Sequence, residues 1–229
     1  MKSIVILSGG LDSTTALAGE VTAIREQGGS GQDVLALTFL YGQTHSKELQ
    51  CAAWQAQRWG THYKTIDFRD IARDAFKGSA LTDLGAQAVP HISEAMGDPQ
   101  PVTYVPNRNM VMLSIAVAVA ESYGAKRVVY GAQKHDMYGY WDTTSAFLML
   151  MNAVLQQNRK NAVRIEAPLI DLTKTEVLSR ALALGVDLAH TWSCYKGYDR
   201  ACGTCPTCAE RLKAFQNLGM IDPIPYAGK

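Results

Sequence analysis

A short loop near the N-terminus has the composition of a phosphate-binding loop. The string Ser8-Gly9-Gly10-Leu11-Asp12-Ser13 lies between an apolar strand-like run and a helix-like run. Two adjacent glycines let the backbone curl so that its N–H groups point inward at an anion. The hydroxyls of Ser8 and Ser13 add donors, Ser13 can cap the next helix, and Asp12 can hold Mg²⁺ or orient the loop. A plain strand-to-helix turn needs only one glycine and a cap, so the full string favours a nucleotide.

Four of the five cysteines have the spacing of metal ligands. Cys202, Cys205 and Cys208 follow a Cys-x₂-Cys-x₂-Cys pattern, and Cys194 precedes them with seven residues between. Four thiolates can close a tetrahedral shell around Zn²⁺, which makes the metal structural because no position stays open. An iron–sulfur cluster and a redox-active Cys-x-x-Cys pair are the alternatives, and zinc is favoured. Cys51 lies in a helical segment and is expected to be a small core residue.

The elements that must position these groups alternate between strands and helices. Strands are expected over residues 2–7, 33–41, 62–67, 127–131 and 163–167, and helices over 13–27, 46–59, 109–123 and 143–158. This alternation predicts an α/β fold, a parallel Rossmann-like sheet with helices on both faces. Such sheets bind ligands at the carboxyl ends of their strands, near the topological switch point. Residues 68–102 fit the pattern poorly and are expected to be a lid or a mobile segment.

The composition bounds the class of protein. With 229 residues, one large domain with a small appendage is expected, divided here into a nucleotide-binding catalytic domain (1–185) and a cysteine-bearing segment (186–229). The formal net charge of +1 argues against strong nucleic-acid binding. The longest apolar stretch, residues 110–120, is too short to span a membrane, and no signal-peptide core is present. A cytoplasmic, non-membrane protein is therefore expected.

Several strings together resemble one enzyme family. The loop resembles the pyrophosphatase loop of the PP-loop superfamily, whose members cleave ATP between its α and β phosphates. With the loop and the cysteines, further strings resemble the 7-cyano-7-deazaguanine synthase (QueC, formerly ExsB) family, from about residue 2 to residue 215. These strings are Tyr41-Gly42-Gln43-Thr44-His45, Val105-Pro106-Asn107-Arg108-Asn109, Pro168-Leu169-Ile170, Lys174-Thr175-Glu176 and Thr191-Trp192-Ser193-Cys194-Tyr195.

The resemblance implies an ATP-dependent carbon–nitrogen ligase. Such an enzyme adenylates 7-carboxy-7-deazaguanine, lets ammonia attack to give an amide, then adenylates again and dehydrates the amide to the nitrile. The implied cofactors are ATP, Mg²⁺ and one structural zinc, and the implied partner is a second copy in a homodimer. The implied zinc ligands are Cys194, Cys202, Cys205 and Cys208.

Roles for individual residues follow from the same resemblance. The expected ATP-binding residues are Leu7, Ser8, Gly9, Gly10, Leu11, Asp12, Ser13 and Thr14, with Phe39 and Tyr41 beside the adenine. The expected catalytic residues are Asp12, Ser13, Arg108, Lys174, Asp136 and His45. The expected substrate-binding residues are Gln43, Asn109, Tyr140 and Asp142. Arg108 and Lys174 would counter phosphate charge, and His45 would assist deprotonation of ammonia. Arg108 and Lys174 have a second interpretation as solvated surface charges, and His45 as a structural hydrogen-bonding residue. Glu176 is interpreted as a cap of the helix that it opens.

The sequence departs from the family pattern at two places. Asn107 replaces a usual glycine, and asparagine tolerates the left-handed backbone well. Trp141, Thr143 and Thr144 stand where the family carries other residues, so the pocket is expected to lose a thiol and a cation and to gain an aromatic plane. The acceptor therefore stays open between ammonia and an amine on a protein or other molecule, as in defence-associated relatives. A tRNA-modifying PP-loop enzyme and a zinc module that binds nucleic acid are further alternatives.

Overall fold

The computed structural model describes residues 1–42, 46–82, 89, 102–133, 140–196 and 199–228. Within them lies a five-stranded parallel sheet with the order β3-β2-β1-β4-β5. The strands are β1 (Ser3–Ile6), β2 (Val34–Leu40), β3 (His62–Asp67), β4 (Arg127–Val129) and β5 (Arg164–Glu166). The strand order reverses at β1, so the switch point lies between β1 and β4. The predicted fold class is confirmed.

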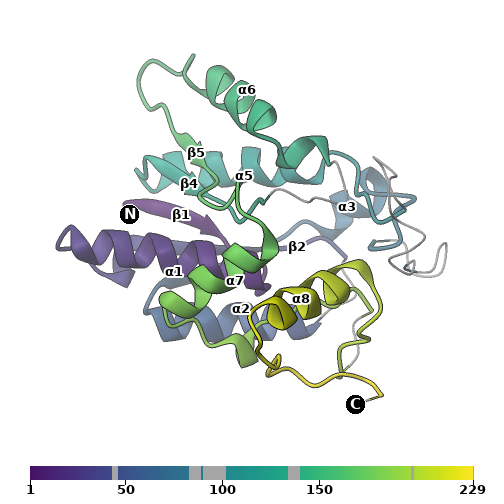
Figure 1. Cartoon of the computed structure of the whole chain (residues 1–229). Coiled ribbons are helices and arrows are strands. Elements are labelled where there is room, and N and C mark those ends of the chain that lie inside the picture. The colour runs from purple at the N-terminus through teal and green to yellow at the C-terminus, as the bar shows by residue number, and fades with distance from the viewer. Residues whose placement is uncertain (43–45, 83–88, 90–101, 134–139, 197–198, 229) are drawn as a thin grey trace.

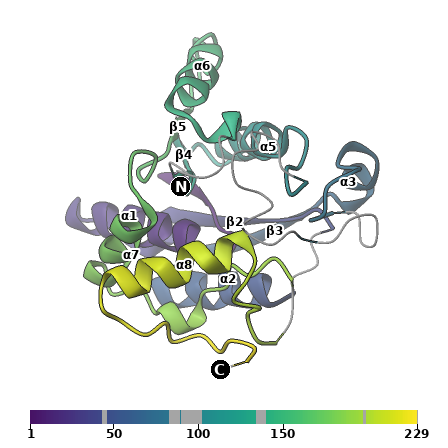
Figure 2. The same ribbon diagram turned by 45° about the vertical axis from the view of Figure 1, so that its right-hand side comes forward.

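Helices cover both faces of this sheet (Figure 1). The helices are α1 (Leu11–Glu26), α2 (Ser46–Trp59), α3 (Arg69–Ala75), α5 (Arg108–Ser122), α6 (Ser145–Leu155), α7 (Lys174–Ala183) and α8 (Pro206–Asn217). Figure 2 shows α1, α2, α7 and α8 on one face and α5 and α6 on the other. Short 3₁₀ turns lie at Gly31–Asp33, Trp141–Thr143 and Leu188–His190. None of the helices in the described ranges has the length and hydropathy to cross a bilayer.

The side-chain alternation of the central strands builds a core on each face of the sheet. In β2, Leu35 and Leu37 pack with α5, whereas Val34 and Ala36 pack with α1 and α2. The buried valine and leucine side chains of this strand contribute roughly 1.5–3 kcal/mol each relative to exposure. The strand at the edge, β3, is mostly exposed, as its position requires. The two cores hold the carboxyl ends of β1, β2 and β4 at a common edge.

Most predicted elements are present, with shifted ends. The predicted cap at Ser13 is wrong: α1 begins at Leu11, its N-cap is Gly10, and Ser13 lies in the first turn. The tight loop delivers the chain into the helix two residues earlier, which frees the Ser13 hydroxyl for Ser8. The helix predicted over 143–158 begins at Ser145, because the Thr144 hydroxyl accepts a hydrogen bond from the Phe147 N–H and caps the helix there.

Other local predictions are confirmed. Asn107 has φ 52°, in the left-handed region. Glu176 caps α7 through a reciprocal pair of hydrogen bonds with Thr173. Of the stretch 68–102, the structure describes α3 and the residues on either side of it as far as 82, with residues 89 and 102. The remainder, on which the lid prediction depends, lies outside the described residues.

The C-terminal segment joins the core of the rest of the chain. Ala214 and Phe215 of α8 belong to the core cluster that contains α1 and α7 residues. Arg211, 1% exposed, forms an ion pair with Asp222 at 2.6 Å and donates to the Thr191 hydroxyl at 2.8 Å. A buried ion pair is costly to break from one side, so it fixes the path of the chain after α8.

Among the described glycines, Gly9 has the least room for a side chain. A Cβ built there would lie 2.2 Å from the carbonyl oxygen of Glu48 and 2.7 Å from the amide nitrogen of Ala52, both in α2, and φ is +89°. On the other side of Gly9, the backbone N–H of Trp192 donates to the Gly9 carbonyl oxygen at 2.9 Å. The phosphate loop therefore lies between α2 and the C-terminal segment without room for a side chain.

We predict that Gly9→Ala destabilises the protein by roughly 2–4 kcal/mol, the combined effect of overpacking and a left-handed alanine. Gly28→Ala is the matched control, because Gly28 has φ 78° but nothing within 4 Å of a Cβ. The control should lose only about 1–2 kcal/mol. Chemical unfolding of both variants measures the difference, and equal losses would contradict the close-contact interpretation.

Candidate active site

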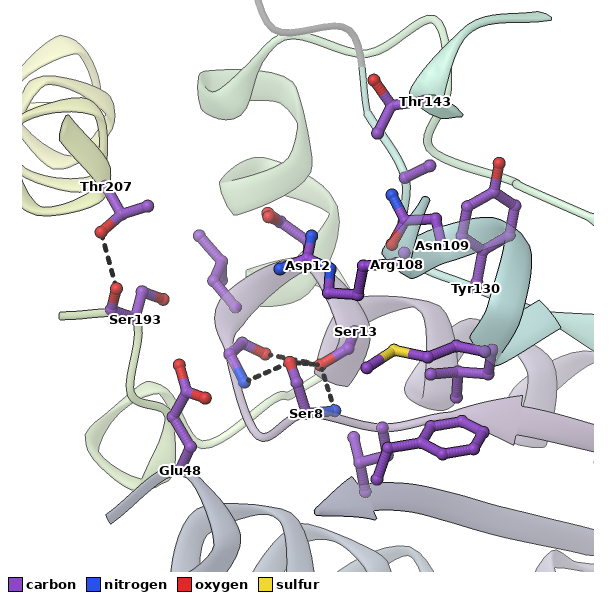
Figure 3. A pocket seen from close by; sticks show the side chains of 18 of the residues that line it. Ser8, Asp12, Ser13, Glu48, Arg108, Asn109, Tyr130, Thr143, Ser193 and Thr207 are labelled. Atoms are coloured by element: carbon purple, nitrogen blue, oxygen red, sulfur yellow. Dashed lines mark hydrogen bonds between the residues drawn. The ribbon is translucent and has the colours of Figure 1, made fainter. Parts of the chain in front are cut away.

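A cavity of about 260 Å³ lies at the carboxyl ends of β1, β2 and β4. The phosphate loop forms one side, and the first turn of α5 and the residues after β4 form another (Figure 3). Lys174 of α7 and the C-terminal residues Ser193, Tyr195 and Thr207 complete the lining. The cavity therefore lies at the topological switch point, where ligands of open parallel sheets bind.

The phosphate loop is closed by its own two serines. The Ser8 and Ser13 hydroxyls lie 2.9 Å apart, and the Ser8 N–H donates to the Ser13 hydroxyl at 3.2 Å. The Gly10 N–H donates to the Ser8 hydroxyl at 3.3 Å. The loop thus places the N-terminus of α1, with its partial positive charge, beside the cavity. This arrangement suits an anion such as a phosphate group.

Asp12 and Lys174 form an ion pair at the cavity wall. The Lys174 Nζ lies 2.9 and 2.8 Å from the two carboxylate oxygens of Asp12. Both side chains are mostly buried, with Lys174 16% exposed and Asp12 25% exposed. The contact joins the first turn of α7 to the first turn of α1 across 162 positions of sequence. Lys174 is therefore held at the loop by Asp12, and its ammonium group does not extend into solvent.

Arg108 is the central cation of the opposite wall. It follows the left-handed Asn107, lines the cavity and forms a side-chain hydrogen bond with Tyr41. Burial acts to lower the pKa of Arg108, but the phenols of Tyr41 and Tyr195 and the carboxyl of Asp142 raise it above its ordinary value. The guanidinium therefore stays charged in the cavity.

Asp142 and Tyr140 lie behind Arg108, around a small second cavity of about 20 Å³. Asp142 is 3% exposed; burial raises its pKa, while the charge of Arg108 and hydrogen bonds from Asn109 act to lower it. The Tyr140 hydroxyl lies 2.9 Å from the Thr103 hydroxyl. Asp142 therefore holds Asn109, and neither of these predicted substrate residues lines the larger cavity.

The other predicted residues divide into three groups. Those that line the larger cavity are Leu7, Ser8, Gly10, Leu11, Asp12, Ser13, Phe39, Tyr41, Arg108, Asn109 and Lys174. Gly9 and Thr14 are not in the lining: Gly9 contacts α2, and Thr14 is fully buried in α1. Gln43, His45 and Asp136 lie outside the described residues.

Glu48 and Tyr130 are the two polar cavity residues, among several that the sequence did not predict, that differ most from an ordinary wall residue. Glu48, in the first turn of α2, lines the cavity, and burial raises its pKa to about 8 while the charge of Arg108 acts to lower it. Tyr130, directly after β4, is 6% exposed, and its hydroxyl has no hydrogen-bond partner among the described residues. The available signals were an acidic residue in a helical first turn and a tyrosine at a strand end, and both are common without function.

The family departures change the cavity less than expected. Trp141 donates to the Tyr104 hydroxyl at 3.1 Å and packs edge-on against Phe147, so it lines neither described cavity. The expected aromatic plane is therefore absent from their linings. Thr144 caps α6, and Thr143 alone of the three lines the larger cavity.

The four clustered cysteines form a potential metal site. Their Sγ atoms all lie within 4.8 Å of one another, and the Sγ atoms of Cys202 and Cys208 are 3.9 Å apart. Tetrahedral Zn–S bonds of about 2.3 Å would place sulfurs about 3.8 Å apart, so the arrangement fits such a metal. Hydrogen bonds with Cys194 and Cys208 lower the pKa of Cys205. Cys51 is 8% exposed in the core, as predicted.

Backbone N–H groups support the sulfurs. The Cys202 and Lys196 N–H groups donate to the Sγ of Cys194, at 3.3 and 3.4 Å. The Cys205 and Thr204 N–H groups donate to the Sγ of Cys202, at 3.3 and 3.4 Å. Donors of this kind stabilise thiolates and orient them toward a common centre.

The cysteine cluster also holds part of the cavity wall. Ser193 and Tyr195 flank Cys194, and the Thr207 hydroxyl donates to the Ser193 carbonyl at 2.6 Å. All three residues line the cavity. A metal bound by the cysteines would therefore order this wall as well as the C-terminal segment.

We predict that Cys205→Ser lowers both the metal content and the thermal stability of the purified protein, because metal binding and folding are coupled. Cys51→Ser is the control, since it removes a thiol outside the cluster and should leave the metal content unchanged. Elemental analysis and thermal unfolding provide the measurements. A Cys205→Ser protein of unchanged metal content would exclude the cluster as the binding site.

Comparisons with known proteins agree with this geometry. A family model described as "Queuosine biosynthesis protein QueC" matches residues 2–219. A 7-cyano-7-deazaguanine synthase of Caldicellulosiruptor bescii is 41% identical over 226 residues, covering 99% of this chain and 97% of that protein. The 7-cyano-7-deazaguanine synthase of Chromohalobacter salexigens is 42% identical over 227 residues, covering 99% of this chain and 86% of that protein. "7-cyano-7-deazaguanine synthase 1" of Colwellia psychrerythraea is 40% identical over 226 residues, covering 98% of each chain. Because the match covers nearly the whole chain and includes both the phosphate loop and the cysteine cluster, this chain belongs to the QueC family.

Proposed function

We propose that this chain is an ATP-dependent carbon–nitrogen ligase that converts 7-carboxy-7-deazaguanine and ammonia into 7-cyano-7-deazaguanine. The observation that carries the proposal is the switch-point cavity, where the loop of Ser8 and Ser13 faces Arg108 and Lys174. Full-length relatives about 40% identical are named for this reaction. A carboxylate is a poor electrophile, and transfer of AMP to it provides the leaving group that nitrogen attack requires.

In the proposed adenylation, each charged group of the cavity has a separate function. The loop and the N-terminus of α1 receive the β and γ phosphates, whose negative charge they stabilise. Arg108 holds the carboxylate of the substrate near the α phosphate, because a guanidinium can bind an oxyanion bidentately. Lys174 turns from Asp12 toward the departing pyrophosphate. Mg²⁺, when bound beside Asp12, would neutralise phosphate charge, and a carboxylate at the phosphate loop is a suitable ligand for it.

The rest of the cavity is suited to a flat heterocycle. Phe39 and Met112 provide apolar walls, and the Tyr130 hydroxyl provides an unused hydrogen-bonding position. Asn109, at the first turn of α5, adds an amide beside Arg108. A buried hydroxyl without a partner is costly, so a ring nitrogen or exocyclic group that binds it gains affinity. We assign the base-recognition role to this side of the cavity.

The proposed metal of the cysteine cluster is one structural zinc ion. The closed set of four sulfurs leaves no position for a substrate, and its contribution is to hold Ser193, Tyr195 and Thr207 at the cavity. The reduced thiolates that it requires persist in the cytoplasm, which is the proposed location.

The proposal includes a homodimer assembled through α6. This helix has no charged residue, and Met149, Leu150 and Val154 are exposed by 65%, 62% and 70%. Figures 1 and 2 show α6 standing out from the body of the molecule. An uncharged apolar face can pair with its own copy about a two-fold axis without repulsion.

We predict that Leu150→Glu with Val154→Glu converts the dimer to a monomer, since two like charges per helix would meet across the axis. Sedimentation at micromolar concentration measures the mass, and Arg159→Glu, beyond the end of the helix, is the control. A wild-type chain that sediments as a monomer would exclude the dimer.

The function is tested by product mass spectrometry with ATP, 7-carboxy-7-deazaguanine and ammonia. We expect the nitrile, with AMP and pyrophosphate released. If ammonia gives no product whereas an amine-bearing partner gives an amide, the acceptor is not ammonia and the proposal fails.

Asp12→Asn connects that activity to the loop. The variant should release no AMP and should remain folded, with some loss of thermal stability because Lys174 loses its charged partner. Wild-type turnover by this variant would remove Asp12 from the mechanism.

A further inference from the structure

Glu48 is a carboxyl group of the cavity wall that the adenylation step does not use. It lies in the first turn of α2, whose backbone presses against Gly9 of the phosphate loop. Figure 3 shows its carboxylate directed into the space between Ser193 and the loop. The contact at Gly9 fixes the backbone of this turn, from which the Glu48 side chain extends.

The charged groups around Glu48 do not neutralise it by direct pairing. No ion pair to Glu48 occurs among the described residues, and its neighbour Lys47 lies over the Trp192 ring at 4.0 Å and donates to the Asp199 carbonyl. Arg108 is the cation that acts on it from α5. The titratable groups that face this space or act on Glu48 from the surrounding elements are Asp12, Tyr41, Cys51, Lys174, Tyr195 and Arg211.

These surroundings make the Glu48 carboxylate more basic. Burial raises the pKa of Glu48 to about 8, and Arg108 offsets part of the effect. A carboxylate of this kind is a far stronger base than one in water. General bases work best when their pKa lies near the working pH.

The proposed reaction needs such a base. Near neutral pH ammonia is mostly ammonium, which has no lone pair and cannot attack a carbonyl carbon. A pocket carboxylate attracts the cation, and a basic carboxylate can remove its proton. The sequence predicted that His45 assists the deprotonation of ammonia, but His45 lies outside the described residues.

We propose that Glu48 binds ammonium in the cavity and accepts the proton that converts it to the attacking ammonia. The proposal rests on the ligase function above. Ammonium gives one proton to the carboxylate, and the nitrogen lone pair forms the bond to the acyl carbon. The bond from that carbon to the AMP oxygen breaks, and AMP leaves with the electron pair. The further proton that the nitrogen must lose passes to the AMP phosphate or to water.

The test is Glu48→Gln with two nucleophiles. Hydroxylamine is a much weaker base than ammonia and is largely unprotonated near neutral pH, so it needs no base to become a nucleophile. We expect the ammonium-dependent rate to fall about 10²-fold or more, the size of a general-base contribution. The hydroxylamine-dependent rate should fall at least tenfold less, and ATP–pyrophosphate exchange should persist. Glu26→Gln, the same change at an exposed position of α1, is the control.

Equal losses with both nucleophiles would overturn the proposal, as would an unchanged rate with ammonium. If wild type forms no adenylate, as judged by the absence of ATP–pyrophosphate exchange, the ligase function itself fails. Glu48→Asp retains a carboxylate and should recover part of the ammonium-dependent rate.

A measurement of stability gives a readout independent of activity. The folded-state pKa of Glu48 lies above its ordinary value of 4.5, so this group's contribution to stability is full below that value and is lost as pH rises through about 8. Glu48→Gln lacks this loss. The melting temperature of Glu48→Gln minus that of wild type should therefore increase as the pH is raised from about 5 to about 8.5. A difference that stays constant with pH would contradict the strongly basic carboxylate.

Discussion

The contact of the Gly9 backbone with α2 is the constraint on which the rest of the site depends. A carbonyl oxygen of α2 occupies the place of a side chain at Gly9, and the Trp192 N–H holds the loop from the other side. One residue without a Cβ therefore brings three distant parts of the chain together. The loop, the Glu48 carboxyl and the cysteine-bearing segment share one anchor, so a shift in any of them moves the other two.

Charge in the cavity is arranged around this anchor. Asp12 and Lys174 neutralise each other at the loop, whereas Arg108 lies among phenols and a buried carboxyl on the opposite wall. In such a site the interaction between charges is stronger than in water, and an unpaired charge is costly. The raised pKa of Glu48 is the cost of holding a carboxyl group without a direct partner. An anionic substrate, as proposed above, would supply the negative charge that Arg108 lacks in this cavity.

How much could be predicted differs from one part of the molecule to another. The ends of α2 and β3 were predicted as they are observed, because the turn residues that flank these segments are local signals. The Ser13 cap failed because loop geometry, not residue type, decides where a helix begins. The role of Trp141 also failed, since its direction depends on Tyr104 and Phe147, which no spacing rule relates to it.

The amino-acid order alone determined the class of fold, the phosphate loop, the set of four cysteines and the family, because each of these is carried by short strings or by periodicity. Tertiary structure alone decided the partners: that Lys174 meets Asp12, that Tyr140 and Asp142 lie behind Arg108, and that Glu48 enters the cavity. The physical reason is that a side chain's pKa and reach depend on neighbours distant in sequence, which only the packing of the two helical layers onto the sheet brings within a few ångströms.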